Sequence, residues 1–301
     1  RRQRQMCIRD SFHPADLSIL TQKVTSFRLG KAYGVHAFSG NVGWAAAPLF
    51  VIYATQLFNW KTALILAGFL GLFVVLFFII FGNDLNDRKF GSNVRIDAPV
   101  FSLASLNENL SLLFSSTILS CFCFFALLAA ALVGVQSFGI SAIQDLYDIN
   151  ITHATFALST FLVCSAIGIL SGGILADKTT RHDLIAMIGV MLSGLVLILI
   201  GSQLITASSV IACLGLSGFF SGFTAPSRDM LVKKVTPTGS TGRIFGFVYS
   251  GLDFGSSLMP LLLGLIMDIG SGSYVFYACA VMLFLTIFTV VNVKKRSSTA
   301  F

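Results

Sequence analysis

Long apolar runs separated by short polar stretches dominate the chain. Eight of these runs are long enough to cross a membrane, because a helix needs about 20 residues to span a hydrocarbon layer of about 30 Å. Backbone amides inside lipid must be paired within their own segment, so each run is predicted to be an α-helix. The predicted spans cover residues 33–55, 62–82, 112–136, 153–176, 184–204, 207–226, 244–267 and 274–293.

Basic residues follow one side of this pattern. When successive loops are assigned to alternate sides of a membrane, one side receives nearly all the Lys and Arg that lie beyond residue 11. The other side receives only Lys61. Loops rich in Lys and Arg stay in the cytoplasm, so both ends of the chain are predicted to be cytoplasmic. We therefore expect an integral membrane protein.

The composition excludes other protein classes. Of the 301 residues, 55% are apolar and only 11% are charged, against about 25% charged residues in soluble domains. A water-soluble globule and a disordered chain are thus excluded, and the net charge of +7 is explained by the basic loops rather than by nucleic-acid binding. Five of the six Cys lie inside apolar runs. We therefore predict no disulfide framework, no metal site and no cofactor.

The polar intervals predict five regions. Residues 1–11 match nothing that follows and are interpreted as a non-native leader. Residues 12–82 are predicted to be the end of an N-terminal bundle, and residues 83–111 a polar cytoplasmic linker. Residues 112–293 form a C-terminal bundle of six helices, and residues 294–301 a cytoplasmic tail.

An internal repeat supports this organisation. Residues 28–50 match residues 240–262 at a fixed offset of 212. Glycines at helical spacing let membrane helices approach closely, and a proline inside a span bends it. Repeated halves are typical of transporters, so we predict an all-α, polytopic fold with eight of an expected twelve transmembrane helices. The packing and kink residues of the two copies are Gly34, Gly43 and Pro48, and Gly246, Gly255 and Pro260.

One loop carries a more specific resemblance. In the segment GGILADKTTRH, the residues Gly173, Asp177, Lys178 and Arg181 fit the loop G-x-x-x-D-(R/K)-x-G-(R/K)-(R/K). Thr180 and the residue after Arg181 depart from that pattern. The chain resembles the major facilitator superfamily, and its bacterial fosmidomycin-resistance branch is one candidate relative. The resemblance implies two pseudo-symmetric bundles of six helices, a monomer, and secondary active transport of a small molecule by alternating access.

The same resemblance implies a cytoplasmic gate. Asp177 would face the positive N-terminal end of a neighbouring helix, and pseudo-symmetry places that end at the start of the span 33–55. Arg28 and Lys31 would then lie close to Asp177. The alternative is a solvated loop that only sets the topology.

Asp253 is the one carboxylate well inside a predicted span. It lies about 16 Å from the cytoplasmic edge, near the centre of the bilayer. An ionisable group at this depth indicates function, and the simplest function is binding the coupling proton. Its repeat counterpart is Asn41, which is the second candidate. This pairing leaves open a polar helix contact at both positions.

Small hydroxyl and aromatic residues are the candidates for the substrate cavity. The resemblance implies that the spans 112–136 and 207–226 line it. A cavity of this composition has no fixed charge, which favours a small amphipathic compound. Most of the hydroxyls could instead bond to their own helix backbone. The candidates are Ser116, Ser120, Phe124, Ser217, Phe220, Ser221 and Thr224.

Two other function classes remain open. Residues 215–218 spell the G-x-S-G string of intramembrane serine hydrolases, but such an enzyme needs a His base. In that family the base comes from a later helix, and all four His lie upstream of Ser217. We therefore expect no enzyme. A membrane receptor or scaffold with the same fold would be distinguished by the absence of substrate flux.

Overall fold

A computed structural model describes residues 12–81, 113–237 and 241–297. The predicted leader (1–11) and linker (83–111) lie outside the described residues. The chain forms two compact units, of which the first contains residues 1–38 and 111–301 and the second residues 39–110. The predicted boundaries of the domains stay predictions.

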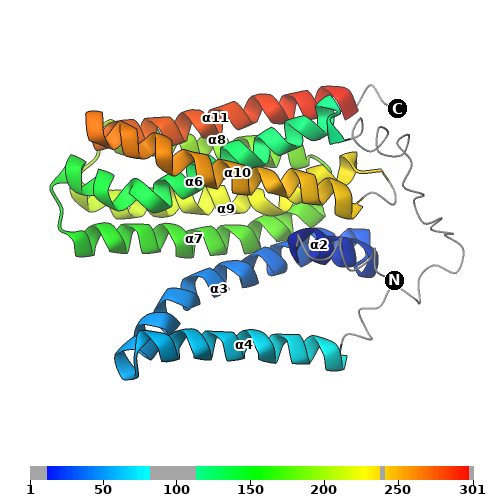
Figure 1. Ribbon diagram of the computed structural model, residues 1–301. Helices are drawn as coiled ribbons and strands as arrows, with labels where there is room; N and C mark the ends of the chain where they lie inside the picture. The colour runs from blue at the N-terminus through cyan, green and yellow to red at the C-terminus, as the bar shows by residue number, and fades with distance from the viewer. Residues whose placement is uncertain (1–11, 82–112, 238–240, 298–301) are drawn as a thin grey trace, which may run out of the picture. The chain divides into compact units, whose positions relative to one another are not determined.

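The described elements are helical (Figure 1). Before the linker they are α2 (Phe12–Lys23), the 3-10 turn η1 (Ser26–Arg28), α3 (Leu29–Leu57) and α4 (Trp60–Phe81). The later elements are α6 (Ser116–Tyr147), α7 (Ile151–Lys178), α8 (His182–Gly201), the 3-10 turn η4 (Ala207–Ser209), α9 (Val210–Val235), α10 (Thr241–Ile269) and α11 (Gly272–Ser297). Each of the eight predicted spans thus corresponds to one long helix.

Among the described residues, seven helices are long and apolar enough to cross a membrane: α4 and α6 to α11. The eighth predicted span corresponds to α3, whose 29 residues also suffice in length. Its first half is rich in Gly, Ser and other weakly apolar residues, which lowers its hydropathy. The helical, polytopic fold is confirmed, with the apolarity of α3 as the exception.

Some helix bounds differ from the prediction. The span 112–136 is in fact a helix from Ser116 to Tyr147. Ser137, Ser141 and Gln144 are polar, but they continue the helix because helical hydrogen bonding does not require apolar side chains. The helix ends at Asp148, which adopts the left-handed conformation with φ of 49°. Hydropathy therefore marks the apolar part of a helix and not its end.

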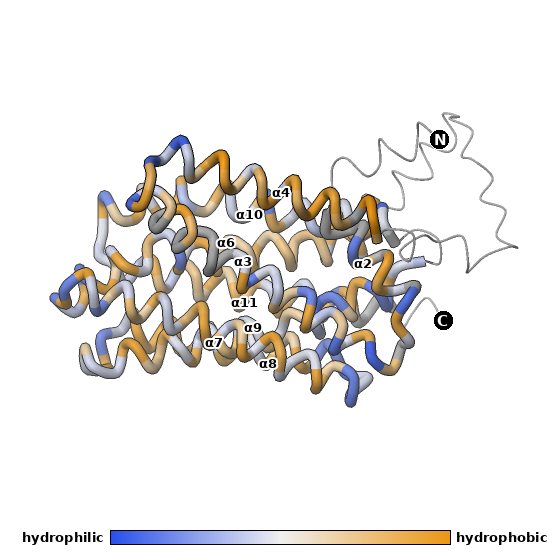
Figure 2. The backbone as a smooth tube through the Cα atoms, turned by 90° about the horizontal axis from the view of Figure 1, so that it is seen from below, coloured by the Kyte–Doolittle hydropathy of each residue, from blue (hydrophilic) through white to orange (hydrophobic). Residues whose placement is uncertain are grey.

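The six helices α6 to α11 pack into one bundle in the first unit. The main contacts join α7 to α9, α6 to α10 and α11, and α8 to α9 and α11. Figure 2 shows apolar residues distributed over these helices rather than gathered inside. Phe288, for example, is 70% exposed on α11. Outward-facing apolar side chains of this kind are expected of helices that contact lipid.

Glycines allow the closest of these contacts. Gly168 and Gly172 on α7 face α9, and Gly218 and Gly222 on α9 face α7. A Cβ atom at any of the four would collide with a backbone carbonyl oxygen of the opposite helix. Two G-x-x-x-G faces therefore meet each other, which lets the two backbones touch.

The predicted packing glycines have different surroundings. A Cβ at Gly255 would collide with the carbonyl oxygen of Ala126 on α6, so this glycine permits the contact of α10 with α6. Gly246 is half-buried in α10, and Pro260 lies inside the same helix. Gly43 has open space around it. The side chain of Pro48 lies outside the described residues.

Candidate gate and transport site

The carboxylate of Asp177, at the end of α7, contacts the start of α3. Its Oδ1 accepts the backbone N–H of Gly30 at 2.7 Å, and its Oδ2 accepts that of Lys31 at 3.2 Å. The first N–H groups of a helix have no partner within the helix and carry partial positive charge. One carboxylate thus satisfies two of these donors on α3. We call this contact the α7–α3 latch.

Small residues bring the two helices close enough for the latch. A Cβ at Gly30 would lie 2.8 Å from both Ala176 Cβ and Asp177 Oδ1. One turn further along, a Cβ at Gly34 would lie 3.2 Å from the Cα of Gly173. A side chain at position 30 would therefore force its neighbours to shift, and one at position 34 would press tightly against the backbone of α7.

The basic residues of the predicted gate do not bind Asp177. Arg28, Lys31, Lys178 and Arg181 are all exposed, and within the described ranges none forms a salt bridge with it. Asp177 is bound instead by backbone N–H groups of α3. His182, which follows Arg181, is buried as the first residue of α8.

A buried charged cluster lies on α9 and α10. Arg228 Nε donates to Asp229 Oδ1 at 3.0 Å, and the Tyr249 hydroxyl donates to the same oxygen at 2.9 Å. The Arg228 guanidinium lies 4.4 Å from the centre of the Phe125 ring, within the range of a cation–π contact. The side chain of Asp229 is only 3% exposed. The sequence indicates Arg228 and Asp229 as charged residues at the inner end of a span, but nothing in it pairs Tyr249 with Asp229.

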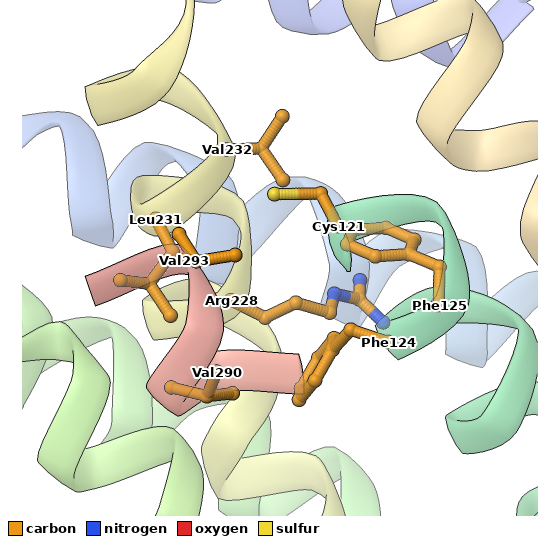
Figure 3. Close-up of a pocket in the computed structure, with 8 residues that line it drawn as sticks. All are labelled: Cys121, Phe124, Phe125, Arg228, Leu231, Val232, Val290 and Val293. Atoms are coloured by element: carbon orange, nitrogen blue, oxygen red, sulfur yellow. The ribbon is translucent and has the colours of Figure 1, made fainter. Parts of the chain in front are cut away.

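Arg228 also lines a small apolar pocket between α6, α9 and α11 (Figure 3). The predicted cavity residue Phe124 lies in this pocket and is 4% exposed. Its walls are formed by helices of the six-helix bundle itself. Its other lining residues are Cys121, Phe125, Leu231, Val232, Val290 and Val293.

The predicted cavity hydroxyls of α9 face α8. Ser193 on α8 forms hydrogen bonds with the hydroxyl of Ser217 at 2.9 Å and with that of Ser221 at 2.8 Å. Thr224 donates to the carbonyl oxygen of Ser221 at 2.7 Å. All of these side chains are buried, so in this structure they form a polar contact between two helices.

The remaining cavity candidates are spread over other contacts. Ser120 donates to the carbonyl oxygen of Ser116 at 2.7 Å and accepts a hydrogen bond from Asn292 on α11 at 3.1 Å. Phe220 is half-buried and contacts Phe219 edge-on. The structure therefore does not bring the seven candidates together around one cavity, and their role stays a prediction.

The two proton candidates occupy different surroundings. Asp253 is exposed on α10, and within the described ranges its carboxylate forms no hydrogen bond or ion pair. Only its backbone carbonyl has a side-chain partner, the hydroxyl of Ser256 at 3.1 Å. Asn41 is half-buried in α3. The middle of α10 thus presents a free carboxylate on the side facing away from the bundle.

Comparison with known families decides the class of the protein. The family model described as Major Facilitator Superfamily matches residues 113–300, which include all six helices from α6 to α11. The chain belongs to the major facilitator superfamily. A comparison with curated protein sequences gives no match.

Membership explains the apolar helices. The protein is an integral membrane transporter of the major facilitator type, a family that moves small molecules across lipid bilayers. The serine of the G-x-S-G string fits this class, because the hydroxyl of Ser217 is fully buried against Ser193.

Proposed function

We propose that this member of the major facilitator superfamily is a secondary active transporter that works by alternating access. The observation that carries the proposal is the α7–α3 latch between Asp177 and the backbone of Gly30 and Lys31. It joins a helix before the linker to the bundle after it. In a transporter with two rocking bundles, such a contact closes one end of the substrate path and must break when that end opens.

The strength of the latch suits this role. Hydrogen bonds to a charged group contribute about 1.5–3 kcal/mol, which a conformational equilibrium of a few kcal/mol can exchange. The latch lies at the end of the chain's helices that carries the basic loops, including Lys178 and Arg181. The positive-inside rule assigns this end, with both termini of the chain, to the cytoplasm. We expect the membrane to be a bacterial-type inner membrane.

Proton coupling is the second part of the proposal. Asp253 lies 12 positions after Thr241, where α10 begins, and carries a carboxylate without a partner among the described residues. A charge at this depth is costly unless it meets water, a counter-charge or a proton. Asp253 would exchange a proton as its environment alternates between wet and dry. Asn41, its repeat counterpart, cannot titrate.

A cross-linking experiment tests the gate. Gly30 and Ala176 are replaced by Cys in a variant without other Cys. Their Cβ positions lie 2.8 Å apart and must separate to about 3.5–4.5 Å to form a disulfide, so a small shift of α3 accompanies the bond, and flux of the reduced variant is the baseline. A panel of amphipathic molecules is first screened in proteoliposomes for any compound that the unmodified protein moves. Oxidation of the Cys pair should stop the flux of that compound. Reduction should restore it. The control pair is Asp145 and Ser271, which contact each other within one bundle. Cross-linking this pair should leave flux intact.

Two results would count against the proposal. Flux that continues through a fully cross-linked Gly30–Ala176 pair would show that the latch is no gate. Absence of flux for every compound of the panel would favour a receptor or scaffold with this fold.

The coupling step is tested at Asp253. The Asp253→Asn variant should lose flux that is driven by a pH gradient but keep substrate exchange measured in the absence of a gradient. Unchanged pH-driven flux would contradict it.

A further inference from the structure

The middle of α10 combines a carboxylate with exposed aromatic surface. On a helix with about 100° per residue, Ser257 and Ser250 lie between Asp253 and Phe254 around the helix. All four residues are exposed, and the ring of Phe254 is 57% exposed. Of the described helices α10 is also the most strongly amphipathic. Within about one helical turn on either side of Asp253, this face of α10 therefore presents a carboxylate, two hydroxyls and an aromatic ring.

The aromatic part of this face is continuous and anchored. The Phe254 ring lies 6.2 Å from that of Phe122 on α6, and Phe122 stacks on Phe247 at 5.1 Å. Phe247 in turn contacts Phe114 edge-on at 5.8 Å. Because Gly251 and Gly255 hold α10 directly against the α6 backbone, the row of rings is fixed relative to Asp253.

We infer that Asp253 and the aromatic row that begins at Phe254 bind a lipophilic organic cation, which would be the class of substrate. The inference rests on the proposed transport function. A carboxylate supplies the counter-charge that a cation needs inside a membrane, and the faces of aromatic rings attract cations. The hydroxyls of Ser250 and Ser257 are small enough to leave room for bulky groups between acid and ring. Arg228 does not oppose the cation, because Asp229 neutralises it inside the bundle.

This assignment refines the expectation of an amphipathic substrate. A proton and an organic cation would then compete for the same carboxylate. Binding one would release the other, which is the exchange needed for proton-driven export of a cation.

The test compares two probes of nearly equal size and opposite charge. Binding of tetraphenylphosphonium and of tetraphenylborate to the purified chain in detergent is measured by equilibrium dialysis. The wild-type chain should prefer the phosphonium. Asp253→Asn should lose that preference by about tenfold or more, and Phe254→Leu should weaken phosphonium binding about two- to fivefold. Asp268→Asn is the matched control, because Asp268 is exposed on the same helix near its end.

The outcomes separate this inference from the proposed function. Equal binding of both probes, or a preference unchanged in a correctly folded Asp253→Asn variant, would overturn the cation site. The fold of each variant is checked by size-exclusion chromatography and helical circular dichroism. If the phosphonium binds at Asp253 but no flux occurs, the transport proposal fails and the site stands. If pH-driven flux depends on Asp253 but the phosphonium does not bind, the cation inference alone fails.

Discussion

The carboxylate of Asp177 holds two consecutive backbone N–H groups of α3, with Oδ1 2.7 Å from the nitrogen of Gly30. The two residues are 147 positions apart in the sequence. Neither partner at α3 is a side chain, so the contact tolerates changes of residue type at Lys31 but not the loss of its N–H. Glycine at 30 is required instead by the space beside Ala176.

Asp177→Asn should loosen this end of α3. The amide keeps one acceptor oxygen and loses the charge, so about 1.5–3 kcal/mol of charge-assisted hydrogen bonding is reduced. Hydrogen–deuterium exchange read by mass spectrometry should show faster uptake at residues 29–34. Asp148→Asn is a suitable control, because Asp148 is exposed and Asn tolerates its left-handed backbone. Uptake that is equal in the two variants would contradict the latch.

The expected position of Asp177 came from the family resemblance. Pseudo-symmetry implied that its carboxylate faces the N-terminal end of the span 33–55, close to Arg28 and Lys31. In the structure Asp177 accepts the backbone N–H groups of Gly30 and Lys31, whereas the sequence did not indicate which two backbone groups would donate. Backbone donors have no signature in a side-chain pattern.

The hydroxyl candidates show a second limit of the sequence. Helical periodicity puts Ser217 and Ser221 on one face of α9, four residues apart. It does not say which neighbouring helix that face meets, and Ser193 on α8 was not singled out. The hydrogen bond between Tyr249 and Asp229 was not predicted for the same reason, because it joins two different helices. Contacts between helices depend on packing angles that periodicity alone does not determine.

Gly222→Ala should destabilise the contact of α7 with α9. The added Cβ would collide with the carbonyl oxygen of Ser165, and backbone shifts of this kind cost about 1–3 kcal/mol. Unfolding by SDS in mixed micelles should occur at a lower SDS fraction than in the wild type. Gly139→Ala is the matched control, because its Cβ would meet only Val135 Cγ1, at an ordinary 3.6 Å. A Gly222→Ala variant at least as stable as Gly139→Ala would refute the close approach.

Ser193→Ala should weaken the contact of α8 with α9. Its hydroxyl bonds to both Ser217 and Ser221, and all three side chains are buried. Removing it leaves buried hydroxyls with fewer partners, at about 1–3 kcal/mol. The comparison is Ser159→Ala, whose hydroxyl is exposed and bonds only to the Thr155 carbonyl of its own helix at 3.0 Å. That variant should stay within about 0.5 kcal/mol of wild type in the same unfolding assay. Equal losses in both would show that the buried cluster adds nothing.

Substitutions at Arg228 and Asp229 should be strongly coupled. Asp229→Ala leaves a guanidinium without its carboxylate among Phe125 and the other pocket residues, and breaking a buried ion pair costs about 3–5 kcal/mol. Arg228→Leu combined with Asp229→Leu removes both charges, so the double variant should be more stable than Asp229→Ala. Tyr249→Phe should cost about 1 kcal/mol in the wild type and less in the double variant, because its hydrogen bond to Asp229 is then gone. Unfolding free energies from the SDS assay supply all the terms of this cycle. If Tyr249→Phe costs the same in both backgrounds, the hydroxyl acts independently of Asp229, and the pair is held by packing around Arg228 rather than by the hydrogen-bonded cluster.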